Sequence, residues 1–184
     1  MRLHAAAIVV IVIASAGCDL VFPPGTFDQD AMVDAAPPDC AGIPYQSIAG
    51  APSVYRIEAV TVLPWPEAEQ TCEADRPGGT HLVVFDDITE LLAVRQEMLG
   101  LGGFGAYAGY ARDPTDPPNM FRTVTGEPLS PVSNLWEPGE PTGGTEQVIY
   151  FANDEDLIDG PANFELIYVC ECDGKPVTES FTFP

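Results

Sequence analysis

The chain has 184 residues, of which 46% are hydrophobic, and its 28 acidic side chains against 7 basic ones give a formal net charge of −21. This length allows one folded domain with additional segments, and the apolar content is too high for an acidic disordered chain. So negative a balance excludes nucleic-acid binding, which needs a basic face to displace phosphate counterions, and disfavours docking on anionic lipid. It favours solubility or an affinity for cations.

Residues 1–17 have the pattern of an export signal. Arg2 precedes an apolar run from Ala5 to Ala16, and small residues lead directly into Cys18. The run is too short to span a bilayer as a helix, which needs about 20 residues. The junction resembles the lipobox of bacterial lipoproteins, in which the chain is cut before a cysteine whose thiol receives a diacylglyceryl group. Ser15 stands where that motif usually has leucine. We predict a lipoprotein signal peptide over 1–17 and lipidation of Cys18, with a plain secretory signal as the alternative.

Residues 18–39 combine the lipidated cysteine with a stretch rich in proline and aspartate, which predicts a tether. The expected localisation is therefore the bacterial cell envelope, with the protein exported and lipid-anchored, and with the outer membrane or cell surface favoured over the inner membrane. Asp19 resembles the inner-membrane retention signal of some Gram-negative bacteria, so the choice of membrane stays open.

The remaining chain predicts an α+β domain over residues 40–174 and a C-terminal tail over 175–184. Alternation of β-forming residues indicates a strand at 53–62, and proline and glutamate at the start of a polar-apolar stretch indicate a helix at 66–74. The further expected elements are a strand at 81–85, a helix at 88–99 capped by Asp86 or Asp87, a proline-rich irregular region over 112–145 with a brief strand near 121–124, and strands at 147–151 and 164–170.

Four cysteines lie within the predicted domain, namely Cys40, Cys72, Cys170 and Cys172. An even number in an exported chain indicates disulfides, and the spacing does not match a zinc site. Cys170 and Cys172 point to the same side of a strand, so each needs a different partner, and a bond between the two would strain the backbone. The other two pairings remain open on these grounds.

Six segments occur in the order of one known family. They are Trp65, Ala68 and Cys72 as W-x-x-A-x-x-x-C; Gly79-Thr-His-Leu-Val-Val-Phe-Asp-Asp with Glu90; Tyr107-Ala-Gly-Tyr; Thr125-Gly-Glu-Pro-Leu; Trp136-Glu-Pro-Gly-Glu-Pro; and Val169-Cys-Glu. Together they make residues 40–173 resemble the C-type lectin-like domain. The resemblance implies an α+β fold with two helices, small antiparallel sheets and a long irregular loop region, stapled by disulfides.

The resemblance also implies a disulfide pattern. It pairs Cys72 with Cys170, which leaves Cys40 and Cys172 as partners. The family's second bridge, in the loop region, is missing here because Val148 and Ala162 occupy the matching places. We expect hydrophobic contacts and prolines, or a metal, to hold the loops instead.

In sugar-binding members of this family, acidic and amide side chains of three short motifs hold Ca²⁺ and bind sugar hydroxyls. The matching residues here are Glu140-Pro141-Thr142, with a proline that is usually cis in the family, then Glu146 and Leu157-Ile158-Asp159. The implied metal ligands are Glu140, Glu146 and Asp159, and the implied ligand-binding set adds Thr142. Both amide ligands are replaced, by a weak oxygen donor in Thr142 and by Ile158, which has no ligating atom.

Ca²⁺ is thus the one cofactor that the pattern suggests, and the alternative is that these acids are solvated loop residues. Asn153-Asp154-Glu155-Asp156 offers a second acidic group, which we interpret as a solvated turn. An enzyme is not expected. His81 is the only histidine beyond the signal and matches a structural position of the family, so nucleophilic catalysis lacks a base.

The sequence therefore predicts a membrane-anchored extracytoplasmic binding module that recognises a glycan with Ca²⁺ dependence. The alternative is metal-independent recognition of, or adhesion to, a cell-surface protein; a structural envelope protein without a specific ligand is a third interpretation. Beyond its ligand, the predicted partner is the membrane, through the lipid anchor, and no nucleic acid.

Overall fold

The computed structural model describes residues 40–129, 132–152 and 157–183, which lie within one compact unit spanning 34–184. The predicted signal peptide, Cys18, the tether and the acidic group at 153–156 lie outside the described residues. The elements in chain order are β1 (Gln46–Ser47), β2 (Val54–Leu63), α1 (Trp65–Asp75), β3 (Thr80–Leu82), α2 (Ile88–Gly100), β4 (Gly105–Ala111), β5 (Arg122–Thr123), β6 (Val148–Ala152), β7 (Leu157–Gly160) and β8 (Leu166–Cys172). None of the helices in the described ranges is both long enough and apolar enough to span a bilayer.

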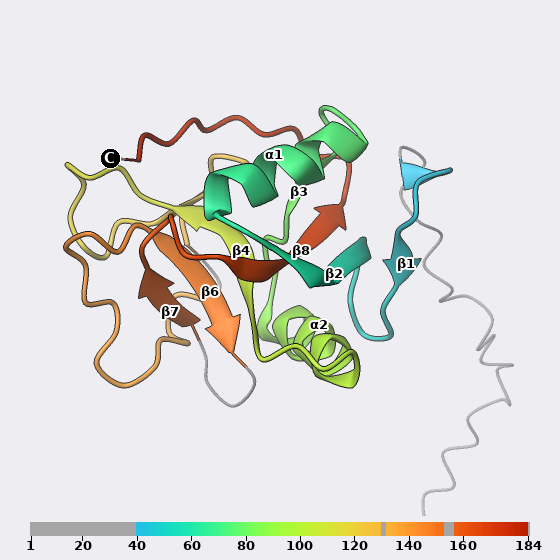
Figure 1. Cartoon of the computed structure of the whole chain (residues 1–184), viewed down its shortest axis with the longest axis horizontal. Coiled ribbons are helices and arrows are strands. Elements are labelled where there is room, and N and C mark those ends of the chain that lie inside the picture. Colours follow the sequence, from blue (N-terminus) through green and yellow to red (C-terminus); the bar gives the residue numbers. More distant parts are fainter. Residues whose placement is uncertain (1–39, 130–131, 153–156, 184) are drawn as a thin grey trace, which may run out of the picture. The chain divides into compact units, whose positions relative to one another are not determined.

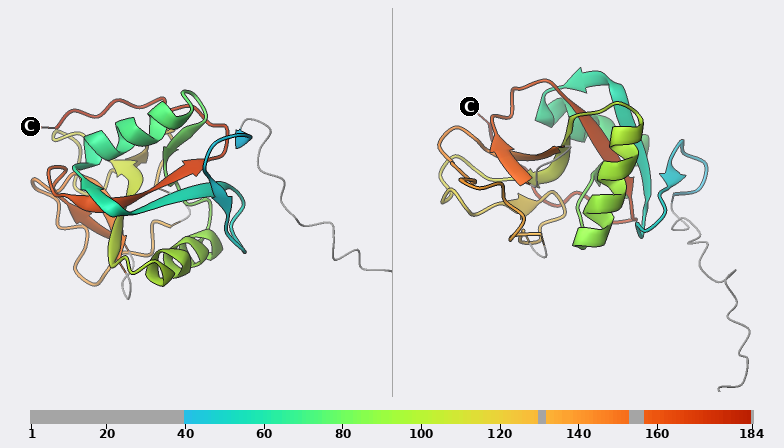
Figure 2. Two further views of the ribbon diagram at one scale, coloured as in Figure 1. Left: turned by 45° about the vertical axis from the view of Figure 1, so that its right-hand side comes forward. Right: turned by 90° about the horizontal axis from the view of Figure 1, so that it is seen from below.

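Strand β8 lies in the middle of a single mixed sheet with the order β1-β2-β8-β4-β6-β7. It pairs antiparallel with β2 and β3 and parallel with β4, while β5 pairs antiparallel with the end of β4. Helices α1 and α2 lie on opposite sides of β2, β8 and β4 (Figures 1 and 2). This arrangement leaves β6, β7 and the irregular loops at one side of the molecule.

Both helices form where the sequence predicts them, for local reasons. Helix α1 begins with proline in its first turn and with Glu67 near the positive end of the helix dipole. Helix α2 is capped by Asp87, whose side chain accepts a hydrogen bond of 2.9 Å from the backbone N–H of Glu90. Each helix turns one apolar face toward the sheet, and in α1 that face carries Trp65, Ala68 and Cys72.

Strand β4 has no counterpart among the predicted strands, because five of its seven residues are glycine or alanine, which are depleted in strands, and only its two tyrosines favour one. Its composition follows from close packing. The N–H of Gly109 donates to the carbonyl of Val83 at 2.8 Å, and a Cβ atom at position 109 would lie 2.4 Å from the carbonyl oxygen of Leu82. Only glycine permits this approach, so the residue that hides the strand from prediction is the one the packing requires. The short strands β1 and β7 were likewise not predicted.

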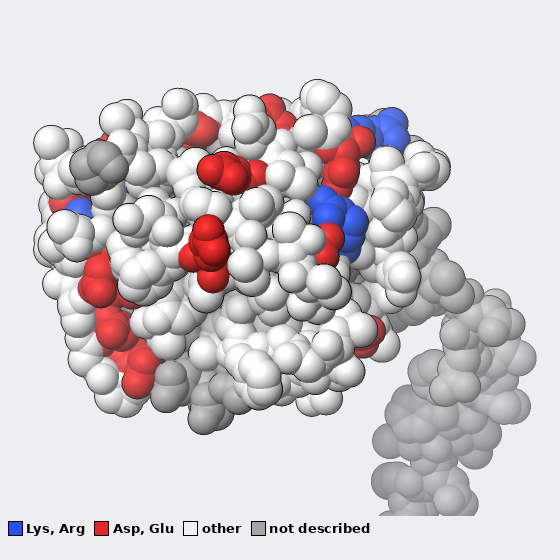
Figure 3. Space-filling view, viewed as in Figure 1, with Lys and Arg blue, Asp and Glu red and all other residues white. Residues whose placement is uncertain are grey.

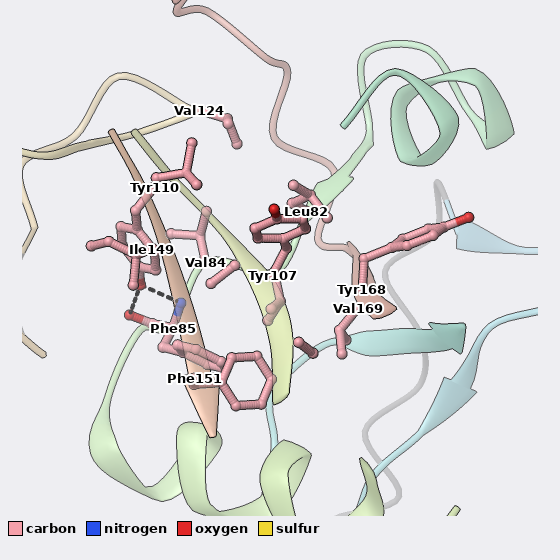
Figure 4. Close-up of a cluster of buried hydrophobic side chains, with 14 of the residues drawn as sticks. Leu82, Val84, Phe85, Tyr107, Tyr110, Val124, Ile149, Phe151, Tyr168 and Val169 are labelled. Atoms are coloured by element: carbon pink, nitrogen blue, oxygen red, sulfur yellow. Dashed lines mark hydrogen bonds between the residues drawn. The ribbon is translucent and has the colours of Figure 1, made fainter. Parts of the chain in front are cut away.

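The core lies between the sheet and the two helices, and Figure 4 shows its central cluster. Phe85 and Phe151 meet edge to face with ring centroids 5.2 Å apart, and the N–H of Phe85 donates to the hydroxyl of Tyr110 at 2.7 Å. Trp65 donates from its indole to the carbonyl of Ala108 at 2.9 Å. Phe181 and Phe183 from the segment after β8 pack edge-on against the same indole, so this segment is part of the packed domain.

Two disulfides attach distant segments to β8. One joins Cys72 of α1 to Cys170, and the other joins Cys40 to Cys172. This is the pairing that the family resemblance implies, and it gives each of the two β8 cysteines its own partner.

Buried charged residues surround the junction of β3 and β8. His81 is fully buried and contacts the carboxylate of Asp173 at 3.0 Å. Burial by itself lowers the pKa of His81, but its hydrogen bond to Asp173 and the charge of Glu171 outweigh burial and raise that pKa to about 9. Burial raises the pKa of Glu171 to about 8, against the opposing charge of His81. The histidine is therefore a charged part of the scaffold.

These shifts predict that stability falls as pH rises from about 6.5 to about 9. The folded-state pKa of His81 exceeds its ordinary value, so its contribution is complete below pH 6.5 and is lost as pH passes through 9. The raised pKa of Glu171 acts in the same direction, because the folded chain retains a proton that the unfolded chain releases. The urea midpoint, followed by circular dichroism, should be lower at pH 9 than at pH 6.5. A His81→Gln variant should show a shallower fall, and an equal midpoint at both pH values in the wild type would contradict the prediction.

Candidate functional site

The three predicted calcium ligands come together at the loop side of the domain. The carboxylates of Glu140, Glu146 and Asp159 offer oxygen atoms that all lie within 4.8 Å of one another. Glu140 and Glu146 come from the loop before β6, and Asp159 comes from β7. Acidic side chains also gather on the side of the surface where the ribbon places β6, β7 and their loops (Figures 1 and 3).

Asp159 anchors the loop that carries the other two acids. It is 3% exposed, and its two carboxylate oxygens accept hydrogen bonds from the backbone N–H groups of Thr142 at 2.9 Å and Gly143 at 2.8 Å. The N–H of Thr142 also donates to Glu140 at 2.9 Å. The peptide bond between Glu140 and Pro141 is cis. Side chain and backbone together therefore fix the acidic group in one compact turn.

Thr142 and Ile158, which replace the amide side chains of the sugar-binding motifs, differ in their surroundings. Thr142 lies within the group, and its hydroxyl donates to a carboxylate oxygen of Glu146. Ile158 is 8% exposed and pairs in β7 with Tyr150 of β6, so it packs as an apolar residue of the sheet. The structure thus brings the three carboxylates and Thr142 together and gives Ile158 no place among polar ligands.

The charges of this acidic group are not balanced by basic side chains. Among residues 40–129, 132–152 and 157–183, no lysine or arginine forms an ion pair with Glu140, Glu146 or Asp159. A hydrogen bond to Asp159, partial burial and the charges of both neighbouring acids raise the pKa of Glu140 to about 7. Repulsion among the three carboxylates is therefore relieved by a proton or by a bound cation.

The donor set fits Ca²⁺. This ion takes six to eight oxygen ligands, and three carboxylates supply up to six, with the hydroxyl of Thr142 as a weak further donor. The backbone hydrogen bonds to Asp159 do not exhaust its oxygens, because each carboxylate oxygen has two lone pairs. All the donors of this group are oxygen atoms, which are the ligands that a hard cation prefers.

A second group with metal-ligand side chains lies elsewhere and is chemically different. It consists of His81, Glu171 and Asp173 at the junction of β3 and β8. Lys175 contacts Asp173 at 3.0 Å, and the charged His81 contacts it from the other side. This group already contains its own cations, so the acidic loop is the better candidate for an external ion.

Three residues in or next to this loop were not among the predicted site residues. Gly143 adopts a φ of 74°, and a Cβ atom there would lie 2.5 Å from Pro118, so the tandem glycines at 143–144 were an available signal. Tyr150 pairs in β6 with Ile158 of β7, and partial burial together with the charges of the nearby carboxylates raises its pKa. Arg112 is fully buried beneath the loop, and no sequence pattern indicated it.

Comparison with solved structures identifies the fold. The C-type lectin CEL-I from Cucumaria echinata matches with a TM-score of 0.60 and 17% identity over 76% of this chain and 99% of that one. The C-type lectin domain of murine dendritic cell inhibitory receptor 2, solved in complex with N-glycan, matches with a TM-score of 0.54 and 20% identity over 74% and 98%. Herring type II antifreeze protein matches with a TM-score of 0.57 and 16% identity over 78% and 100%. The chain has the C-type lectin-like fold.

Sequence comparison gives no further relative: a search of protein-family models and one of curated protein sequences each found no match. At these identities the neighbours establish the C-type lectin-like fold alone. They include lectin-type binding domains, one of them in complex with a glycan, and also an antifreeze protein. The predicted α+β fold with two helices and stapling disulfides is confirmed.

Proposed function

We propose that the chain is a binding module that holds Ca²⁺ at Glu140, Glu146 and Asp159 and recognises a glycan at this loop. The observation that carries the proposal is the gathering of three carboxylates around one cis-proline turn, with no ion-pair partner among the described residues. A cation held there would neutralise the group and leave coordination positions open to sugar hydroxyls. The neighbour solved with an N-glycan supports glycans as the ligand class for this fold.

We further propose that the protein is exported and held in the bacterial envelope by a lipid on Cys18. The support is the sequence pattern of residues 1–18 and the two disulfides, which form in oxidising compartments. A tether over 18–39 would then present the domain away from the membrane.

Metal-independent recognition of a surface protein is the second candidate, and a specific observation favours it. Both amide ligands of the sugar-binding pattern are missing, and the residue at one of these positions, Ile158, is buried. Loss of two oxygen ligands weakens any calcium site and changes the hydrogen bonds available to a sugar. The two candidates therefore differ in whether binding needs the metal.

Calcium binding is tested by titration calorimetry on the purified protein. We expect a dissociation constant of about 10⁻⁴–10⁻³ M, as is typical of extracellular modules. At 10 mM Ca²⁺ this affinity should stabilise the fold by about 1.4–2.7 kcal/mol, visible as a higher urea midpoint. A Glu140→Gln variant should bind at least tenfold more weakly, because it loses one of the three ligating charges.

The control is Glu165→Gln, which removes an equal charge from an exposed turn before β8 and should bind calcium like the wild type. A Thr142→Asn variant restores an amide oxygen within the group and should bind more tightly. Absence of binding heat in the wild type, or an equal affinity in Glu140→Gln, would show that these acids are solvated loop residues.

Ligand class is tested on a glycan array with and without EDTA. We expect binding to a subset of glycans that EDTA abolishes and that Glu140→Gln reduces at least tenfold, since the metal both shapes the loop and contacts the sugar. Glu165→Gln again serves as the control. If no glycan binds and the protein instead captures an envelope protein in the presence of EDTA, the metal-independent candidate replaces this one.

A further inference from the structure

The acidic loop lacks the disulfide that members of the C-type lectin-like family have in this region. Val148 and Ala162 fill the places of the loop bridge, and both are buried. Between β5 and β6, the described residues 124–129 and 132–147 contain none of the helices or strands of the fold. Something else must therefore hold the loop against β7 and β4, because Glu146 reaches the other two acids only if its backbone is fixed.

The buried side chain of Arg112 holds the loop through hydrogen bonds to its backbone carbonyls. It follows the last residue of β4 and is 2% exposed. Its guanidinium donates to the carbonyl of Gly144 at 2.8 Å and to the carbonyl of Glu146 at 3.1 Å. From the other side of the same fork it donates to the carbonyl of Asp116 at 3.2 Å.

The backbone and the ring system around Arg112 reinforce this connection. The backbone N–H of Arg112 donates to the carbonyl of Gln147 at 2.9 Å, and the side-chain amide of Gln147 donates to the carbonyl of Arg112 at 3.4 Å. The guanidinium carbon lies 5.8 Å from the ring centroid of Phe121. A buried arginine is thus satisfied by loop carbonyls and an aromatic face, with no ion-pair partner in the described part of the chain.

This bonding pattern depends on arginine chemistry. The guanidinium is planar and presents five N–H donors, so it binds several carbonyls from two segments at once. Lysine carries a single ammonium group and cannot bridge the same set. A neutral replacement of similar length would leave buried carbonyls without donors, which opposes the closed loop conformation.

We propose that Arg112 is the positioning residue of the acidic loop and that its hydrogen bonds hold the loop in place of the missing disulfide. By binding the carbonyls of Gly144 and Glu146 it holds the Glu146 side chain next to Glu140 and Asp159. The link to calcium affinity rests on the proposed function, whereas the effect on loop order does not.

The experiment measures amide hydrogen exchange and calcium affinity for Arg112→Met and Arg112→Lys. In both variants the amides of residues 143–147 should exchange at least tenfold faster than in the wild type, while those of β2 and β8 keep their protection. Calcium should bind at least tenfold more weakly. Arg122→Met is the matched control: this arginine pairs with Asp113, Asp116 and Glu179, and no described hydrogen bond joins it to the loop.

Unchanged exchange at 143–147 in Arg112→Met, or an equal acceleration in Arg122→Met, would overturn the proposal. If Arg112→Met does not fold, Arg112→Lys decides by the same comparison, since it keeps the charge and loses only the fork. If the wild type binds no calcium, the proposed function fails, and the exchange data still decide whether Arg112 positions the loop.

Discussion

The bonding of strand β8 is the constraint on which the rest of the structure depends. Its two cysteines, two residues apart, point to the same side and are joined to α1 and to the start of the domain. Its backbone pairs with three other strands. A disulfide lowers the conformational entropy of the unfolded chain, and a central strand forms hydrogen bonds along both edges. Strand β8 therefore combines covalent and hydrogen-bonded connections in one short segment. The remaining sheet can then end in the loops that carry Glu140 and Glu146.

The interactions that hold those loops differ from the interactions that hold the core. The core is held by apolar packing and by disulfides, whereas the acidic loop is held by hydrogen bonds to its backbone. Asp159 accepts from two N–H groups on one side, and Arg112 donates to two carbonyls on the other. A segment fixed in this way opens with a lower free-energy cost than the sheet, because few apolar groups leave their contacts. The loop can therefore change its order without involving the core.

Sequence reasoning found the elements whose patterns are local and missed those that depend on contacts. Both helices have local signals, namely an early proline in α1 and the Asp87 cap with an apolar face in α2. Strand β4 does not, because Gly109 serves a close approach to Leu82 that exists only in the folded chain. The three carboxylates were identified by their resemblance to a known motif, and the structure brings them together. Arg112 could not be found in this way, because its role is defined by carbonyls about 30 residues away along the chain, and backbone carbonyls leave no trace in a sequence.

The excess of acid in the composition is accommodated in more than one way within the described structure. Near β3, Asp173 lies between charged His81 and Lys175, so its charge is balanced inside the domain. Glu171 is buried, and burial raises its pKa against the opposing charge of His81. The group of Glu140, Glu146 and Asp159 has no basic ion-pair partner among the described residues. Because three carboxylates at this spacing repel one another, the group favours a proton or an external cation, and its oxygen donors are of the kind that Ca²⁺ takes.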